Sequence, residues 1–309
     1  MNFQEHSVTF LARLAARKRN PVKPATLKTY GSLLGNHILP AIGQVDMKDF
    51  ANGAMRSFAQ GLADKGLSPK TILEVTQVVK QMFATATDGE GDPLYPRKWN
   101  HEFIDLPTIG KQKQPSLKPE QLAAALDSQM GVFYAFLAGT GLRIGEAVAA
   151  RYAGGGDHTA WYPEGACVSV RTSLWRGREQ APKTPAAVRI VDLDPRLNDL
   201  LAFHTASNTI GDGEFLFKNK SGHHLDENYV RVYSLQPLGI PGFHTFRRFR
   251  ITHLREQGVP EDIIRFWVGH AGAEITDRYS KLAENVEHRQ EWAKKAGLGF
   301  DFPNKEIAV

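Results

Sequence analysis

The sequence is poor in cysteine and has no long apolar run. Cys167 is the only cysteine in 309 residues, so an internal disulfide and a zinc site built from several cysteines are both excluded. No apolar stretch approaches the ~18 to 20 residues that a membrane-spanning helix needs. The first twenty residues lack the apolar core of a secretory signal peptide, and we find no repeat or low-complexity tract. We therefore expect a protein of the reducing cytoplasm with no membrane partner.

What the sequence does contain is positive charge in two concentrated segments. The net charge is +5 and the pI about 9.2. Residues 1–30 hold six lysines and arginines against the single acid Glu5, and residues 244–255 hold four arginines and no acid. This distribution favours a nucleic-acid partner, although an ordinary solvated basic surface is the alternative. The residues that we predict to contact DNA are Arg17, Lys18, Arg19, Lys28, Lys70, Lys80 and Arg248.

The N-terminal third has apolar residues at helical spacing, which predicts a small helical bundle over about residues 5–95. Pro40 is expected to end the first of its apolar stripes. Ser68 and Pro69 supply the N-cap and first-turn proline of the third stripe. The stripes comprise Leu27, Tyr30, Leu34 and Ile38; Phe50, Ala54, Phe58 and Leu62; and Ile72, Val75, Val79, Met82 and Ala86.

The rest of the chain mixes helices with short strands. A helix over 131–138 is expected to end at the glycines of 139–141, and the next to start near Leu142 or Arg143. Strands are predicted between 166 and 193, with a turn at Arg176-Gly177. Further helices are predicted over 195–206, 226–235, 244–257, 260–268 and 274–282. The fold class is therefore mainly α with a small β-sheet (α+β).

These patterns divide the chain into two predicted domains. Residues 1–105 are expected to form a helical domain, and residues 118–309 are expected to form the mixed domain. Residues 106–117, rich in proline, glycine and lysine, are an exposed linker between them. The tail, residues 283–309, is apolar enough to pack on its own domain or on a neighbouring copy.

Breaking a DNA phosphodiester bond without a metal places three demands on a protein. Paired cationic donors must meet the negative charge that builds on the non-bridging oxygens, and the forked guanidinium of arginine suits this best. A nucleophile must attack phosphorus, and a general acid must protonate the leaving 5′-oxygen. The second predicted domain contains residues of all these types.

Arg143 lies in the segment Gly-Thr-Gly-Leu-Arg-Ile-Gly-Glu, residues 139–146, and is expected in the first turn of a helix. A cation there, with the positive end of the helix dipole, makes a local anion site. Glu146 lies one turn on, where it could brace Arg143 or a histidine. A surface Arg–Glu pair is the ordinary explanation of the same spacing.

Five more residues are candidates for the same chemistry: Lys183, His244, Arg247, His270 and Tyr279. His244 and Arg247 lie one turn apart on one helix face. Taken singly, each candidate has an ordinary explanation: a solvated turn lysine, a basic helix surface, a capping histidine and a packing tyrosine. Their order along the chain is the stronger signal.

That order resembles the tyrosine recombinases of the phage-integrase type. In that family an arginine within Gly-Leu-Arg-x-x-Glu is followed by a hairpin lysine, His-x-x-Arg, Gly-His and, nine residues later, a tyrosine. The corresponding residues here are Arg143, Glu146, Lys183, His244, Arg247, His270 and Tyr279. The flanking segments LAGTGLRIGEAVAAR, KTPAAVRIVDL and HTFRRFRITHLREQGVPEDIIRFWVGHAGAEITDRYSKL are similar to the family, and residues 26–43 and 66–86 resemble its helical core-binding domain.

The resemblance implies a reaction. Tyr279 would attack the scissile phosphate and form a 3′-phosphotyrosyl bond, which conserves the bond energy, so that no ATP, metal or other cofactor is needed. Lys183 would protonate the leaving 5′-oxygen, and His244 would accept the tyrosine proton. The remaining roles fall to Arg143 and Arg247, which would hold the non-bridging oxygens, to His270, which would hydrogen-bond the phosphate, and to Glu146, which would support the site from behind.

The resemblance also implies an architecture. A SAM-like core-binding domain and a catalytic domain would clamp double-stranded DNA, and a monomer when free would assemble on DNA as a homo-tetramer. The tail would dock on a neighbouring subunit. Two features depart from the family: the pattern starts near residue 5, so no separate arm-binding domain is expected, and residues 152–157 lack a Trp-x-Asp sequence.

Three other functions remain open on the sequence. A non-catalytic DNA-binding protein could use a helix-turn-helix around Gly258 and Pro260. A type IB topoisomerase-like enzyme would share the chemistry but relax supercoils as a monomer. A zinc enzyme built on His223 and His224 is the most remote, because adjacent histidines point apart and no partner ligand has a suitable spacing.

Overall fold

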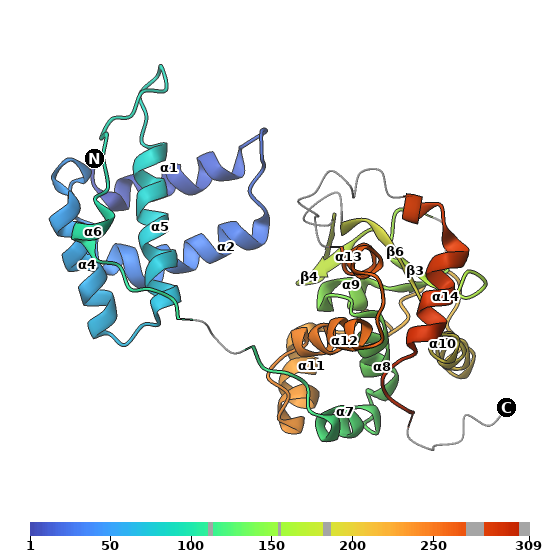
Figure 1. The fold of residues 1–309 in the computed structure, drawn as a ribbon. Helices are drawn as coiled ribbons and strands as arrows, with labels where there is room; N and C mark the ends of the chain where they lie inside the picture. Colours follow the sequence, from blue (N-terminus) through green and yellow to red (C-terminus); the bar gives the residue numbers. More distant parts are fainter. Residues whose placement is uncertain (111–113, 154–155, 182–186, 270–280, 303–309) are drawn as a thin grey trace. The chain divides into compact units, whose positions relative to one another are not determined.

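The computed structural model describes residues 1–110, 114–153, 156–181, 187–269 and 281–302. The chain forms two compact units, Met1–Lys113 and Gln114–Val309 (Figure 1). Both are mainly helical, and the second contains a small sheet, so the predicted α+β class is confirmed. In the described part of the chain, no helix is long and apolar enough to cross a membrane.

The first unit is a helical bundle. Helix α1 (Phe3–Ala15) starts with a capping box, in which the side chains of Asn2 and Glu5 each accept a hydrogen bond from the other's backbone N–H. Helix α5 (Pro69–Thr85) begins as predicted, with Ser68 as its N-cap. The other elements are α2 (Pro24–Leu33), a π-helical turn (Leu34–Ile38), α3 (Leu39–Ile42), a 3-10 turn (Met47–Asp49), α4 (Asn52–Asp64) and α6 (His101–Ile104).

Two predictions for this unit were wrong. The helical run does not end at Pro40, because the chain turns through Leu34–Ile38 and continues as α3. Pro40 lies in the first turn of α3, where its missing N–H removes no hydrogen bond of that helix. The bundle also extends beyond residues 5–95, because Phe3 and Ile104 are both buried in its core.

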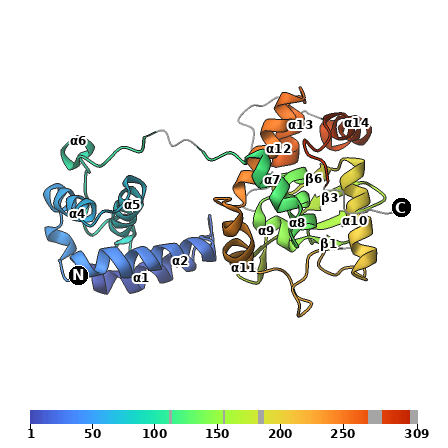
Figure 2. The same ribbon diagram turned by 90° about the horizontal axis from the view of Figure 1, so that it is seen from below.

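Helix α8 (Gly131–Thr140) is the centre of the second unit, and its last eight residues are all buried. Helices α7 (Pro119–Leu126), α10 (Pro195–Ser207) and α12 (His244–Glu256) pack around it (Figure 2). Helix α9 (Ile144–Ala149) follows directly after it. The remaining helices are α11 (Glu227–Val230), continued by a π-helical turn (Arg231–Leu235) and a 3-10 turn (Gln236–Leu238), then α13 (Glu261–Val268), a 3-10 turn (Lys281–Ala283) and α14 (Val286–Ala296).

The sheet has the strand order β1-β2-β3-β6. Strand β1 (Arg151–Tyr152) runs parallel to β2 (Ala160–Tyr162), and the other neighbours, β3 (Cys167–Val170) and β6 (Arg189–Asp192), are antiparallel. Helices α13 and α14 both contact β6 (Figure 1). A separate hairpin joins β4 (Ser173–Trp175) to β5 (Arg178–Gln180).

The predicted turn at Arg176-Gly177 is confirmed, because both residues have positive φ, 50° and 74°, as a tight hairpin turn requires. Strands β1 and β2 were missed, since two or three residues are too few to show an alternating pattern. The helix predicted over 274–282 lies mostly outside the described residues.

Candidate active site

Arg143 lies at the junction of α8 and α9. Gly141 ends α8 with φ at 67°, a conformation that glycine adopts without strain. Arg143 is the N-cap of α9, whereas the sequence pattern predicts the first turn. Its backbone N–H donates to Glu146 Oε2 and its Nη1 donates to Glu146 Oε1, both at 2.9 Å. The Arg143 side chain is still 42% exposed, so a ligand can reach it.

Glu146 is 3% exposed and binds a second arginine, which the sequence analysis missed. Arg189, in β6, donates from Nη1 to Glu146 Oε1 (3.1 Å) and from Nη2 to Oε2 (2.9 Å). Burial alone would raise the pKa of Glu146, but the hydrogen bonds and charges of Arg189 and Arg143 together outweigh it and hold the pKa below its usual value. The available signal was an arginine within an apolar strand, since a buried charge needs a partner.

Replacing Glu146 by glutamine should lower the free energy of unfolding by about 3–5 kcal/mol, because Arg189 becomes an uncompensated buried charge. Urea denaturation at neutral pH measures this. The folded-state pKa of Glu146 is depressed, so the wild-type advantage should be complete above the unfolded-state value of about 4.3 and vanish as the pH falls through the folded value.

The control for this prediction is the double variant Glu146→Leu with Arg189→Met. It removes both buried charges together and should recover most of the lost stability. A double variant as unstable as Glu146→Gln would show that the ion pair is not the cause.

Helix α12 carries His244 and Arg247 one turn apart. Arg247 is 1% exposed. Its Nη1 donates to the carbonyl of Gly141 (2.8 Å), where α8 ends, and its Nη2 donates to the carbonyl of Val268, where α13 ends. The guanidinium of Arg247 therefore joins the ends of two helices, and one of them leads into Arg143.

The electrostatics place these side chains in one cluster. Burial and then the charges of Arg143 and Arg189 lower the pKa of Arg247 to about 10, with Glu146 offsetting part of the effect. Partial burial, followed by the charges of Arg248, Arg247 and Arg143, lowers the pKa of His244. Two guanidiniums, those of Arg143 and Arg189, thus bond to the Glu146 carboxylate, and a third, that of Arg247, lies within range of their charges. A bound phosphate would neutralise this excess of positive charge.

Lys183, His270 and Tyr279 lie outside the described residues. The structure therefore brings together four of the predicted site residues, Arg143, Glu146, His244 and Arg247. Val268, whose carbonyl accepts from Arg247, lies two residues before His270 in the sequence.

The predicted DNA-contacting residues differ in exposure. Arg17, Lys18, Arg19 and Lys28 are exposed. Lys70 is exposed and forms an ion pair of 3.9 Å with Glu74. Lys80 and Arg248 are only partly exposed, burial lowers the pKa of Lys80, and Arg248 donates to the backbone carbonyl of Pro115 and to the side chain of Gln114.

The described part of the tail packs on its own unit. Arg289 in α14 is buried and binds Asp192 in β6, with 2.7 Å between Nε and Oδ2. Ala293 and Leu298 lie in the core of the second unit. The expected docking on a neighbouring subunit can therefore concern only other parts of the tail, such as residues 303–309, which lie outside the described residues.

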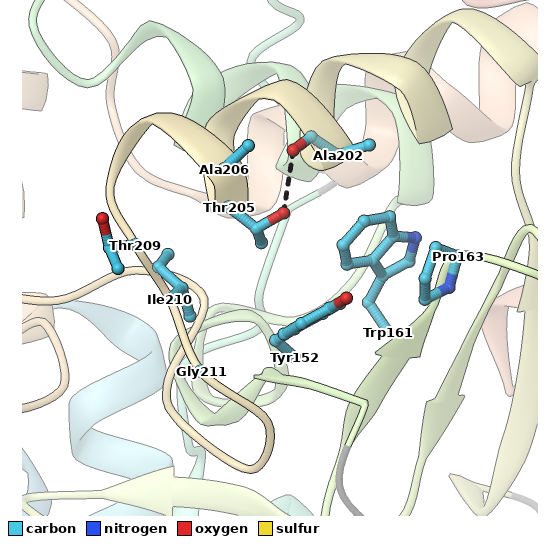
Figure 3. A pocket seen from close by; sticks show the side chains of 9 residues that line it. All are labelled: Tyr152, Trp161, Pro163, Ala202, Thr205, Ala206, Thr209, Ile210 and Gly211. Atoms are coloured by element: carbon cyan, nitrogen blue, oxygen red, sulfur yellow. Dashed lines mark hydrogen bonds between the residues drawn. The ribbon is translucent and has the colours of Figure 1, made fainter.

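A separate pocket of about 400 Å³ lies between α10 and the first two strands (Figure 3). It is lined mainly by apolar groups, and its Thr205 hydroxyl donates to the carbonyl of Ala202. It includes none of the arginines described above. Over the described residues, no group of three or more His, Cys, Asp and Glu side chains could hold a metal ion. The lining residues are Tyr152, Trp161, Pro163, Ala202, Thr205, Ala206, Thr209, Ile210 and Gly211.

No model of a known protein family and no curated protein sequence matches the chain. Solved structures do match it. The Tn1549 transposon integrase in complex with transposon right end DNA has a TM-score of 0.67 at 18% identity, covering 93% of this chain and 98% of that one. A lambda integrase dimer bound to a COC′ core site has a TM-score of 0.61 at 15% identity, covering 88% and 96%. A lambda integrase tetramer bound to a Holliday junction has a TM-score of 0.63 at 15% identity, covering 91% and 80%.

The chain has the tyrosine-recombinase fold. The match extends over both units, so the fold predicted from the resemblance is confirmed for nearly the whole chain. We call Arg143, Arg189 and Arg247 the arginine cluster. It lies where α8 and α13 end, next to the first turn of α12 and the start of β6.

Proposed function

We propose that this protein is a site-specific DNA recombinase that cuts and rejoins DNA through a 3′-phosphotyrosine intermediate. The observation that carries the proposal is the grouping of Arg143 and Arg247 around the buried pair of Glu146 and Arg189, within a tyrosine-recombinase fold. His244 lies close enough for the charges of Arg143 and Arg247 to lower its pKa. These residues come from three separate stretches of sequence. A surface role would not require them to share one cluster.

In this reaction the Tyr279 oxygen attacks phosphorus and the bond to the 5′-oxygen breaks. Arg143 and Arg247 stabilise the charge on the non-bridging oxygens. Lys183 gives a proton to the leaving 5′-oxygen, and His270 hydrogen-bonds the phosphate. Rejoining reverses these steps with a 5′-hydroxyl from another strand, so the phosphotyrosyl bond supplies the energy.

His244 is suited to accept the tyrosine proton. Its lowered pKa keeps the imidazole neutral near pH 7, as a base requires. The cleavage rate should therefore fall as the pH drops through the pKa of His244. Arg248→Gln removes one nearby positive charge, raises that pKa and should move this acid limb to higher pH.

Single-turnover cleavage at saturating DNA, measured from about pH 5 to pH 8, records this limb. Its midpoint should lie below the ordinary histidine pKa of about 6.5, because the pKa of His244 is lowered. His244→Gln is the control and should remove the limb. An acid limb that keeps its position in Arg248→Gln would argue against His244 as the titrating base.

The non-catalytic alternative receives less support. If α12 and α13 acted as a helix-turn-helix, the second helix would enter the major groove. Its first turn carries Glu261 and Asp262, which DNA phosphates repel, and its apolar residues Ile263 and Trp267 are buried. A topoisomerase-like enzyme would relax supercoiled plasmid without exchanging strands between two sites, and a plasmid assay separates it from a recombinase.

We further propose that four copies assemble on double-stranded DNA, because exchange between two duplexes needs four strand cuts. The lambda integrase tetramer on a Holliday junction supports this arrangement for the fold. A monomer in the absence of DNA is expected. Size-exclusion chromatography with light scattering measures both states, without DNA and with a DNA site recovered by covalent trapping from genomic fragments.

The proposal can be tested without knowing the DNA target. The protein is mixed with a pool of genomic fragments and then denatured in detergent, so that only covalently attached DNA remains with it. Sequencing of the trapped fragments should give one or a few sites with a common cut position. Trapping of no DNA above a no-protein control, at any fragment concentration that supports binding, would contradict the proposed function.

A further inference from the structure

A buried hydrogen-bond network connects the C-terminal helix to β6 and α13. Asp192 in β6 is 2% exposed. Its Oδ2 accepts from Arg289 Nε in α14 and from Trp267 Nε1 in α13, each at 2.7 Å. Arg289 Nη2 reaches Asp192 Oδ1 at 3.4 Å, so the guanidinium meets both carboxylate oxygens.

The other nitrogen of the same guanidinium binds the chain just before α14. Arg289 Nη1 donates to the carbonyl of Leu282 and to that of Ala283 (3.1 Å). Trp267, on the other side of the network, lies two residues before Gly269. Arg289 and Asp192 therefore hold both described ends between which residues 270–280 run, and Tyr279 is one of those residues.

The network continues into the arginine cluster. The carbonyl of Trp267 accepts from Arg189 Nε at 2.7 Å, and Arg189 pairs with Glu146, which binds Arg143. Two residues of β6 thus bind Trp267: Asp192 accepts from its indole N–H, and Arg189 donates to its carbonyl. An unbroken series of hydrogen bonds, buried from Glu146 onward, leads from the proposed phosphate-binding Arg143 to Arg289.

We propose that Arg289 is a positioning residue for the proposed reaction: docking of α14 through Arg289 and Asp192 fixes the two ends of the Tyr279 segment relative to the arginine cluster. This inference rests on the proposed function. It assigns to α14 a role within its own subunit, and it requires no contact of Arg289 with DNA, because the side chain is 2% exposed. Loss of the contact should affect cleavage and leave DNA binding unchanged.

A role in stability alone would predict a different pattern, and Arg250 provides the comparison. Arg250, in α12, is also 2% exposed and also holds the tail, because its Nη1 donates to the carbonyl of Gly297 at 2.6 Å. None of the hydrogen bonds described for the Arg250 side chain reaches Asp192, Leu282 or Ala283. Arg250→Met should loosen the far end of α14 and leave the Tyr279 segment anchored.

The experiment uses the full chain and the DNA site recovered by covalent trapping. Single-turnover formation of the Tyr279–DNA adduct is measured at saturating DNA, beside DNA affinity and melting temperature. The variants are Arg289→Met, Arg289→Lys, Arg250→Met, and the charge-neutral pair Asp192→Asn with Arg289→Gln, whose asparagine oxygen can still accept from Trp267. The pair avoids the buried unpaired carboxylate that destabilises a single variant.

Arg289→Met, or the charge-neutral pair if that variant does not fold, should form the adduct about 100-fold more slowly, the loss expected from a small misplacement of a reacting group. DNA affinity should be unchanged, Arg250→Met should stay within about 3-fold of wild type by the same criterion, and Arg289→Lys should recover part of the rate. A folded Arg289 variant with the wild-type rate, or an equal loss in Arg250→Met, would overturn the inference while leaving the proposed function intact. Wild-type protein that forms no adduct would overturn both.

Discussion

Tyr279→Phe should abolish covalent attachment to DNA and lower strand cleavage by at least about 10⁴-fold, the order of effect seen when a nucleophile is removed. Phenylalanine keeps the ring but lacks the oxygen that forms the phosphodiester bond. Binding should be retained, because the positive charges that meet DNA are unchanged. Detergent-stable protein–DNA complexes on a denaturing gel measure the first effect, and a gel shift measures the second.

The matched control is Tyr233→Phe. Tyr233 lies in the same unit, is 69% exposed and contacts Tyr229 at a ring distance of 4.7 Å. Its replacement should leave cleavage within about 3-fold of wild type, as expected for a surface substitution. Persistent adduct formation in Tyr279→Phe would assign the nucleophile to another residue.

Arg247→Lys should slow cleavage by at least about 100-fold, the cost of losing one donor to developing negative charge. Lysine keeps the positive charge but not the fork that reaches the carbonyls of Gly141 and Val268 and that, in the proposed function, also meets a phosphate. Arg247 remains a cation at neutral pH even with its pKa lowered to about 10, so charge is not limiting in the wild type. Single-turnover rates on the trapped DNA site give the comparison.

Arg250→Lys is the control for this substitution. Arg250 lies one turn further along α12, is equally buried, and also has its pKa lowered to about 10 by burial. Both lysine variants should lose stability, but only Arg247→Lys should lose cleavage at temperatures where both are folded. Equal losses of cleavage would mean that the effect comes from a disturbed helix and not from the phosphate site.

Contacts and placements of residues close together in the sequence could be predicted from it. The contact of Arg143 with Glu146 follows from a separation of three residues at a helix start, and the placement of His244 and Arg247 one turn apart follows from helical periodicity. The fold came from the ordered resemblance, which matching integrase structures confirm.

Contacts between residues far apart in the sequence could not be predicted from it. Arg189 reaches Glu146 across 43 residues and Arg289 reaches Asp192 across 97, and no local pattern specifies either pairing. The prediction that Pro40 ends a helix was wrong because the effect of a proline depends on the helical turn it occupies. The π-helical turn at Leu34–Ile38 places Pro40 in the first turn of a new helix, where proline is tolerated. The catalytic roles of all seven predicted site residues stay predictions; they are Arg143, Glu146, Lys183, His244, Arg247, His270 and Tyr279.

The most direct test of the account is mass spectrometry of the trapped complex. After nuclease digestion leaves a short nucleotide on the protein, the peptide that carries the added mass identifies the linked side chain. The account predicts that the nucleotide is joined through its 3′-phosphate to Tyr279, and that Arg143→Ala and Arg247→Ala each reduce this species. A nucleotide on any other residue, or linkage through a 5′-phosphate, would contradict it.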